Sequence, residues 1–188
     1  MNVLIVKLGA TGDVVRTTPL LHRLSGSVTW VTAAKNGVLL DGLSDNLRHF
    51  SWEARACALD ISYDLAINLE DTLEVALFLK SVRPAEIFGA YSDSSQRLRY
   101  TDNSKCWFDL SLISSHGRQE ADRLKLLNRQ SYQKPIFSGL GLYFAGETYL
   151  LPESMDTGAN RRCGHSSRCR PYLADETMGL LRGIDTTA

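Results

Sequence analysis

Residues 3–21 read VLIVKLGATGDVVRTTPLL, and this stretch decides the fold. Its unbroken apolar start is typical of a parallel strand that is buried on both faces. The run breaks at residues 9–13, Gly-Ala-Thr-Gly-Asp, and apolar side chains then return at helical spacing. Pro19 predicts a kink or a restart in that helix. We therefore predict a strand, a glycine-containing turn and a helix over 12–24.

The same alternation of elements continues along the chain. Strands are predicted at 27–33, 47–52, 63–69 and 84–91, and helices at 35–43, 70–82 and 117–142. Strands that alternate with helices form βαβ units and a parallel sheet. The sequence therefore predicts an α/β fold with a Rossmann-like doubly wound parallel sheet. The polar stretch 92–115 is predicted to be a loop or insertion that faces a substrate.

The composition argues against several classes of protein. Lys and Arg together number 21, as do Asp and Glu, so charge gives no reason to expect nucleic acid as a partner. No apolar run approaches the roughly 20 residues that span a bilayer. The apolar start lacks the basic leader of a signal peptide. Four scattered cysteines then indicate free thiols, and we expect a cytoplasmic protein.

The loop at 9–13 is the strongest candidate site, because ligands of open α/β sheets bind where strands end and helices begin. It is not a P-loop, since no Gly-Lys-Ser/Thr follows. Gly9 and Gly12 also lack the third glycine of the dinucleotide fingerprint. A tight turn with Thr11 or Asp13 as the helix N-cap is the purely structural alternative. Spacing alone leaves both interpretations open.

VLIVKLGATGDVVRTTPLL closely resembles the opening of family-9 glycosyltransferases, the lipopolysaccharide heptosyltransferase family. The segments VTWVTA, YDLAINLE and FGAY follow in the family's order. ADRLKLLNRQSYQKPIFSGLGLYFAGETYLLP resembles the end of the family's N-terminal domain. The resemblance covers residues 1–152. It implies the N-terminal, acceptor-side half of a GT-B fold, in which two Rossmann-like domains face each other across a cleft.

The resemblance also implies a reaction: inverting sugar transfer, without a metal or other cofactor, from a nucleotide sugar such as ADP-heptose. The acceptor would be lipopolysaccharide core or a related glycan, which allows peripheral contact with the inner membrane. Asp13 matches the general base that takes the proton of the attacking hydroxyl. The glycines would let sugar and phosphate approach, Thr11 would donate a hydrogen bond, and Lys7 would neutralise phosphate or lie on a solvated flank. The substrate-binding positions are Lys7, Gly9, Ala10, Thr11 and Gly12.

Other polar residues are weaker candidates. Glu70 and Asp71 follow a predicted strand, so they would either line the cleft or, in the favoured interpretation, complement the dipole of the next helix from its first turn. Residues 97–100, Arg-Leu-Arg-Tyr, and Lys105 would meet acidic groups of the acceptor or form a solvated loop.

The tail at 153–188 does not continue the pattern of the preceding chain. It has no strand periodicity, and lysine is not used after Lys134. Cys163, His165 and Cys169 suggest a metal cluster, but their spacing fits no common zinc site. We therefore expect the tail to be irregular or poorly ordered and to hold no metal.

A shift of reading frame accounts for the tail. Back-translation from His165 to Gly179 with a one-nucleotide shift permits IHPGAGPTWRTKRWG, which resembles the phosphate-binding motif of the family's donor domain. We therefore expect a frameshift between Pro152 and His165 and little or no transfer by this chain alone. Two alternatives stay open: a Rossmann-like nucleotide- or NAD-binding protein, and a non-catalytic binding module whose genuine tail recruits a partner or a metal.

Overall fold

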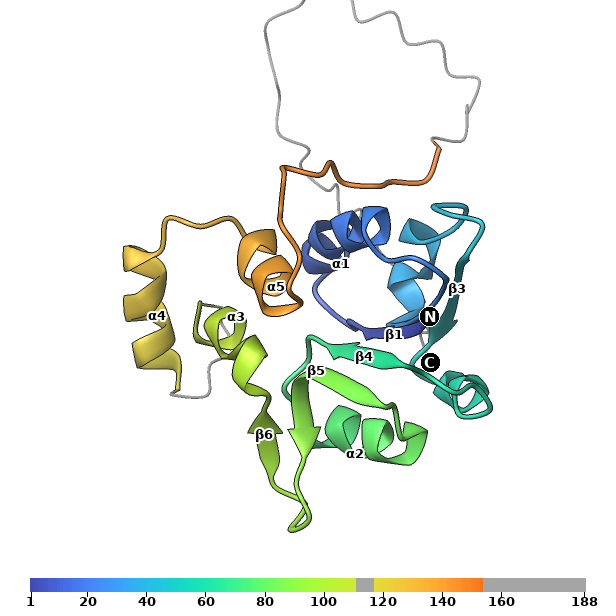
Figure 1. Ribbon diagram of the computed structural model, residues 1–188, viewed down its shortest axis with the longest axis horizontal. Helices are drawn as coiled ribbons and strands as arrows, with labels where there is room; N and C mark the ends of the chain where they lie inside the picture. The colour runs from blue at the N-terminus through green and yellow to red at the C-terminus, as the bar shows by residue number, and fades with distance from the viewer. Residues whose placement is uncertain (111–116, 154–188) are drawn as a thin grey trace, which may run out of the picture. The chain divides into compact units, whose positions relative to one another are not determined.

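A six-stranded sheet lies at the centre of the structure, a computed structural model that describes residues 1–110 and 117–153 (Figure 1). The strand order is β3-β2-β1-β4-β5-β6; the first five strands are parallel, and β6 pairs antiparallel with β5. This doubly wound, Rossmann-like order confirms the predicted fold class. Apart from Glu153, the predicted tail lies outside the described residues. The strands are β1 (Asn2–Val6), β2 (Ser27–Thr32), β3 (Leu47–Ser51), β4 (Leu65–Asn68), β5 (Glu86–Ser92) and β6 (Leu98–Tyr100).

Helices cover both faces of this sheet. In Figure 1, α1, α3 and α5 lie on one side of the sheet and α2 lies on the other. None of the helices within the described ranges is long and apolar enough to cross a bilayer. The α-helices are α1 (Thr11–Thr17), α2 (Leu73–Val82), α3 (Lys105–Leu110), α4 (Arg118–Leu127) and α5 (Gln133–Gly139). Short 3-10 helices are η1 (Thr18–His22), η2 (Ala34–Leu39), η3 (Arg55–Ala58) and η4 (Asp102–Ser104).

The first strand is buried on both faces, as its apolar run predicted. Val3 and Ile5 join the core beneath α1 and α5, whereas Leu4 and Val6 join the core beneath α2. All four side chains are fully buried. Because successive side chains of a strand point to opposite faces, β1 contributes to both hydrophobic cores.

The helix after β1 begins without a side-chain cap. Ala10 occupies the N-cap position, so the predicted N-cap role of Thr11 or Asp13 is wrong. Asp13 lies in the first turn of the helix, where its amide N–H donates to the carbonyl of Ala10 at 2.9 Å. The predicted restart at Pro19 is confirmed, because α1 ends at Thr17 and Pro19 lies in the first turn of η1.

The helix after β4 begins later than predicted. Thr72 is its N-cap, and the Thr72 hydroxyl accepts a hydrogen bond from the Val75 amide at 3.4 Å. Glu70 and Asp71 therefore precede the helix, and their predicted place in its first turn is wrong. Glu74 is the acidic residue that lies there.

The region after β5 is more structured than predicted. The expected loop at 92–115 contains β6, η4 and α3, and the single helix expected at 117–142 is two helices, α4 and α5. Asn128 ends α4 in an extended conformation, and its side-chain oxygen accepts from the Gln130 amide at 2.8 Å. Such a local bond competes with continued helix.

Candidate functional site

The strand order brings two loops together at one edge of the sheet. β1 and β4 are neighbours in register, with Val6 opposite Asn68, but the chain leaves them toward opposite halves of the sheet. Their carboxyl ends therefore form the topological switch point, where open α/β sheets bind ligands. The loop at 7–10 follows β1, and the loop at 69–72 follows β4.

Lys7 is buried at this switch point. Its side chain is 2 % exposed, and its ammonium lies 3.0 Å from Glu70 Oε1 and 3.8 Å from Asp13 Oδ2. The structure thus rules out a solvated flank for Lys7. Glu70 Oε1 also accepts the backbone N–H groups of Leu8 at 2.7 Å and Gly9 at 3.3 Å. One carboxylate oxygen therefore holds both the lysine and the start of the loop.

Asp13 lies at the open side of this arrangement. Its side chain is 32 % exposed, and Arg16 Nη1 lies 3.4 Å from its second oxygen, Oδ1. The Arg16 guanidinium also lies 5.8 Å from the centre of the Tyr132 ring. Burial raises the pKa of the Tyr132 hydroxyl, and the negative charge of Asp13 raises it further. The site thus presents a partly accessible carboxylate between an inner lysine and an outer arginine.

Asn36, in the 3-10 helix η2 that follows β2, forms hydrogen bonds to both ends of the loop between β1 and α1. Its side chain is fully buried, donates to the Leu8 carbonyl at 2.8 Å and accepts from the Thr11 hydroxyl at 2.9 Å. The Thr11 proton, expected to be available to a ligand, is thus already donated to Asn36. The hydroxyl keeps its capacity to accept. The sequence pattern does not indicate Asn36, since a polar residue in a predicted short helix gives no sign of burial.

The two loop glycines are not required by the fold. Neither has a positive φ, and a Cβ atom added to Gly9 or Gly12 would meet no atom within 4 Å. The space beside both residues is therefore open. Ala10, the remaining predicted substrate-binding position, lies between them as the exposed N-cap of α1.

Asn68, at the end of β4, binds the backbone of Glu70, and Gly89 of β5 packs closely against Asn68. The Asn68 amide donates to the Ala90 carbonyl at 2.7 Å, while its side-chain oxygen accepts from the Glu70 N–H at 3.0 Å. Gly89 has a φ of +117°, and a Cβ there would lie 1.9 Å from the Asn68 carbonyl oxygen. Only glycine allows this approach of β5 to β4. The sequence pattern does not indicate a role for Asn68 or Gly89. The available signal is Asn68 itself, a polar residue at the end of an apolar strand.

Asp71 adds a third carboxyl group to the switch point. Burial raises its pKa, and the nearby negative charge of Glu70 raises it further. Burial likewise raises the pKa of Tyr100, with a further contribution from the charge of Asp71. Across residues 1–110 and 117–153, no three His, Cys, Asp or Glu side chains are grouped so that they could hold a metal ion. The three residues of the suggested metal cluster in the tail lie outside these ranges.

The predicted anion-binding residues after β5 pair with carboxylates of their own segment. Arg97 Nε and Arg99 Nε lie 3.3 and 3.1 Å from the same oxygen of Asp93, in the hairpin between β5 and β6. Lys105 pairs with Asp102 at the start of α3. None of the described contacts brings these cations to Asp13.

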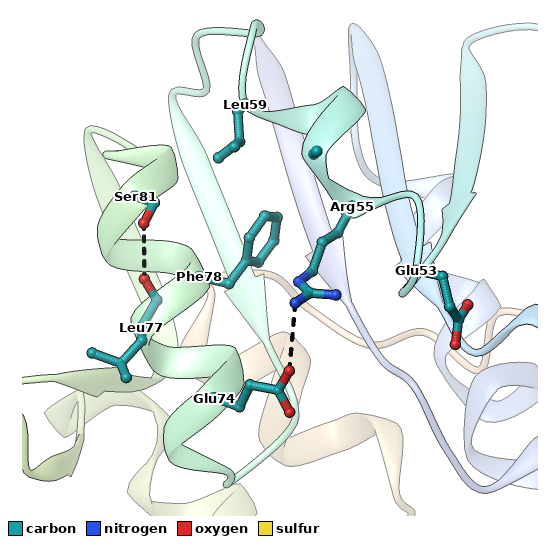
Figure 2. Close-up of a pocket in the computed structure, with 8 residues that line it drawn as sticks. Glu53, Arg55, Leu59, Glu74, Leu77, Phe78 and Ser81 are labelled. Atoms are coloured by element: carbon teal, nitrogen blue, oxygen red, sulfur yellow. Dashed lines mark hydrogen bonds and ion pairs between the residues drawn. The ribbon is translucent and has the colours of Figure 1, made fainter.

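A separate hollow of about 500 Å³ lies between η3 and α2, on the other face of the sheet (Figure 2). Leu59, Leu77 and Phe78 contribute its apolar surface. Arg55 reaches across to Glu74, with 3.5 Å between the two charged groups. The residues that line this hollow include none from residues 7–13.

Comparison with known proteins gives a partial structural likeness. No protein-family model and no curated protein matches the sequence. E. coli heptosyltransferase WaaC with ADP-2-deoxy-2-fluoro heptose is similar over 76 % of this chain and 49 % of its own, with 14 % identity and a TM-score of 0.47. The same enzyme with ADP is similar over 47 % of this chain and 36 % of its own, with 19 % identity and a TM-score of 0.39. This chain thus matches at most about half the length of those proteins.

Proposed function

We propose that this chain is the acceptor-side domain of an inverting glycosyltransferase of the heptosyltransferase type, with Asp13 as its general base. The observation that carries the proposal is the open, glycine-lined space beside a partly exposed carboxylate at the switch point. The sequence resemblance names the substrates: a nucleotide diphosphate sugar such as ADP-heptose and a lipopolysaccharide-type acceptor. A lipid-linked acceptor would bring the protein to the inner membrane as a peripheral partner.

The proposed chemistry needs one base on the acceptor side. Asp13 takes the proton from an acceptor hydroxyl while that oxygen forms its bond to the anomeric carbon. The bond between that carbon and the diphosphate oxygen breaks on the opposite face, so the configuration inverts. The proton stays on Asp13 until it passes to solvent, and the nucleotide diphosphate leaves with the electron pair of the broken bond.

The glycines support an acceptor at this place. A Cβ atom fits at both Gly9 and Gly12, so the use of glycine there is not explained by turn geometry or packing. A sugar ring that lies against the loop needs that space. Three carboxyl groups lie in or beside this region, Lys7 is enclosed, and Arg16 is paired with Asp13, so the diphosphate of the donor is better placed on a second domain.

The proposal therefore includes a donor-side domain encoded in the shifted reading frame after Pro152. Sequencing the coding DNA between the codons for Pro152 and His165 tests this part directly. A one-base correction that opens a frame through IHPGAG supports it. A confirmed frame without that motif in any shifted reading contradicts it and favours the binding module with a genuine tail.

The test of the base is Asp13→Asn in the frame-restored enzyme, assayed with a nucleotide-sugar donor and an inner-core acceptor. A positioned base contributes about 10²–10⁴-fold, so kcat should fall by that factor while the acceptor KM changes little. Asp41→Asn, the same change at an exposed residue that pairs with His49, is the matched control and should leave kcat unchanged. Equal activity of Asp13→Asn and the native enzyme would disprove the assignment.

A further inference from the structure

The buried lysine at the switch point is shared unequally between two carboxylates. Lys7 Nζ lies 3.0 Å from Glu70 Oε1, a hydrogen-bond distance, but 3.8 Å from Asp13 Oδ2, which is too long for one. An ammonium with 2 % exposure must have a charged partner. Glu70 is therefore the hydrogen-bonded partner of Lys7, and Asp13 is a more distant ion-pair partner.

Glu70 is fixed independently of the lysine. The same oxygen, Oε1, accepts the N–H groups of Leu8 and Gly9, and the Glu70 N–H donates to the Asn68 side chain. Its side chain is only 13 % exposed. A carboxylate held by several backbone groups is a firm anchor for a mobile lysine side chain.

We infer that Glu70 is a positioning residue that keeps the Lys7 ammonium out of hydrogen-bond distance of Asp13, so that Asp13 Oδ2 can accept a proton. This inference rests on the proposed function, in which Asp13 is the base. A lysine in direct contact with Asp13 would occupy the oxygen that must receive the proton and would favour its charged form. Glu70 prevents that contact by offering Lys7 a better partner.

The other titratable groups around Asp13 show why the position of Lys7 matters. Arg16 donates to the other oxygen, Oδ1, at 3.4 Å, whereas Oδ2 has the Lys7 ammonium at 3.8 Å and no hydrogen bond among the described contacts. Asp71 adds negative charge near Glu70, and Tyr132, whose pKa burial raises, stays neutral. If Glu70 lost its charge, Lys7 would close on Oδ2 while Arg16 remained at Oδ1. Both oxygens of the base would then accept hydrogen bonds from cations.

Glu70→Gln separates this role from simple support of the loop. Glutamine keeps an Oε1 acceptor for the amides of Leu8 and Gly9 but removes the charge that holds Lys7. We expect Lys7 Nζ to move from 3.8 Å to about 3 Å from Asp13 Oδ2 in a crystal structure of the 188-residue variant. In an NMR titration, the ¹³Cγ signal of Asp13 should keep its charged-form position to lower pH than in the native chain.

Two further variants complete this arm of the test. Lys7→Met combined with Glu70→Gln removes the cation, so the low-pH extension of the Asp13 signal should disappear. Asp71→Asn removes a neighbouring negative charge that has no bond to the lysine, so Nζ should stay on Glu70. If Nζ stays in place and the titration is unchanged in Glu70→Gln, the inference is wrong, whatever the enzyme catalyses.

The kinetic arm uses the frame-restored enzyme. Glu70→Gln should lower kcat roughly tenfold, a part of what a positioned base contributes, with little change in the acceptor KM and with the acid limb of the pH–rate profile at lower pH. Lys7→Met in the same variant should restore most of the loss, which a merely structural role would not allow. If the native enzyme shows no transfer while Nζ moves as expected, the proposed function fails and the positioning of Lys7 stands.

Discussion

Glycines at one edge of the sheet differ in what the fold demands of them. Gly89 has a φ of +117°, and a Cβ there would lie 1.9 Å from a backbone oxygen of the neighbouring strand. Gly9 and Gly12 have no positive φ, and a Cβ at either would meet nothing within 4 Å. The first glycine is explained by packing, and the other two are not. The difference separates the part of the edge that supports the site from the part left open to a ligand.

The carboxylates of Glu70 and Asp13 at the same edge differ in a similar way: one supports the site and the other faces the open space. The side chain of Glu70 is 13 % exposed, and its Oε1 atom accepts hydrogen bonds from the Lys7 ammonium and from the amides of Leu8 and Gly9. The backbone amide of Glu70 donates to the Asn68 side chain. Asp13, 32 % exposed, has cations at 3.4 and 3.8 Å. A mostly buried carboxylate with several hydrogen bonds thus supports a candidate reactive carboxylate that has fewer bonds. Substitutions on the two sides should therefore differ in whether they damage stability or binding.

The largest effect is expected from Gly89→Ala. The methyl group would overlap the Asn68 carbonyl and force β5 away from β4, so the free energy of unfolding should fall by more than about 4 kcal/mol, or the chain should not fold. Urea denaturation followed by circular dichroism measures it. Gly9→Ala is the matched control and should change the midpoint little. Similar midpoints for both variants would remove the distinction between the glycines.

Glu70→Ala should have the next largest effect. It leaves buried Lys7 with a distant partner and the Leu8 amide without an acceptor, so we expect a loss of about 3 kcal/mol. Asp13→Ala, which removes a more exposed carboxylate without a hydrogen bond to the lysine, should cost less than about 1 kcal/mol. Denaturation midpoints compare the two. A greater loss from Asp13→Ala would make Asp13 the main partner of Lys7.

The supporting half of this edge was hard to predict from sequence. Residues 70–72 read Glu-Asp-Thr, and each of these residue types is common at a helix start. The helix begins after Thr72, which frees Glu70 to contact residues 7–9. That contact depends on the register of β1 against β4, which the pattern of either strand alone does not specify.

The open half was easier to predict. The strand, the restart at Pro19 and the doubly wound order follow from apolar periodicity and the alternation of elements. The position of Asp13 follows from that order, because carboxyl ends of parallel strands meet at one edge. The N-cap position did not follow, because the helix begins earlier than predicted. The amides of Asp13 and Val14 donate to the Ala10 carbonyl, so Thr11 lies inside α1.

Asp71→Asn should stabilise the chain modestly and in a pH-dependent manner. Burial and the charge of Glu70 raise the pKa of Asp71 in the folded state, so its ionisation opposes folding as pH rises. The amide removes this cost. The gain should be present at pH 7 and vanish below about pH 4, where the carboxyl is protonated in both folded and unfolded chains. Thermal unfolding at both pH values measures it, and an equal gain at each would contradict the assignment.

The smallest effect on stability, and the most informative about function, is expected from Gly12→Ala. Gly12 lies in the first turn of α1 with open space beside it, so alanine should stabilise the helix by about 0.5 kcal/mol. If a sugar lies against this loop, the same methyl group must weaken acceptor binding, measured by calorimetry with a deacylated inner-core oligosaccharide. Gly42→Ala, at an exposed glycine with a φ of +69°, should show the reverse, with lower stability and unchanged binding. A gain in stability together with a loss of binding at Gly12 would identify a glycine kept for a ligand, whereas unchanged binding would leave that glycine without a role in either.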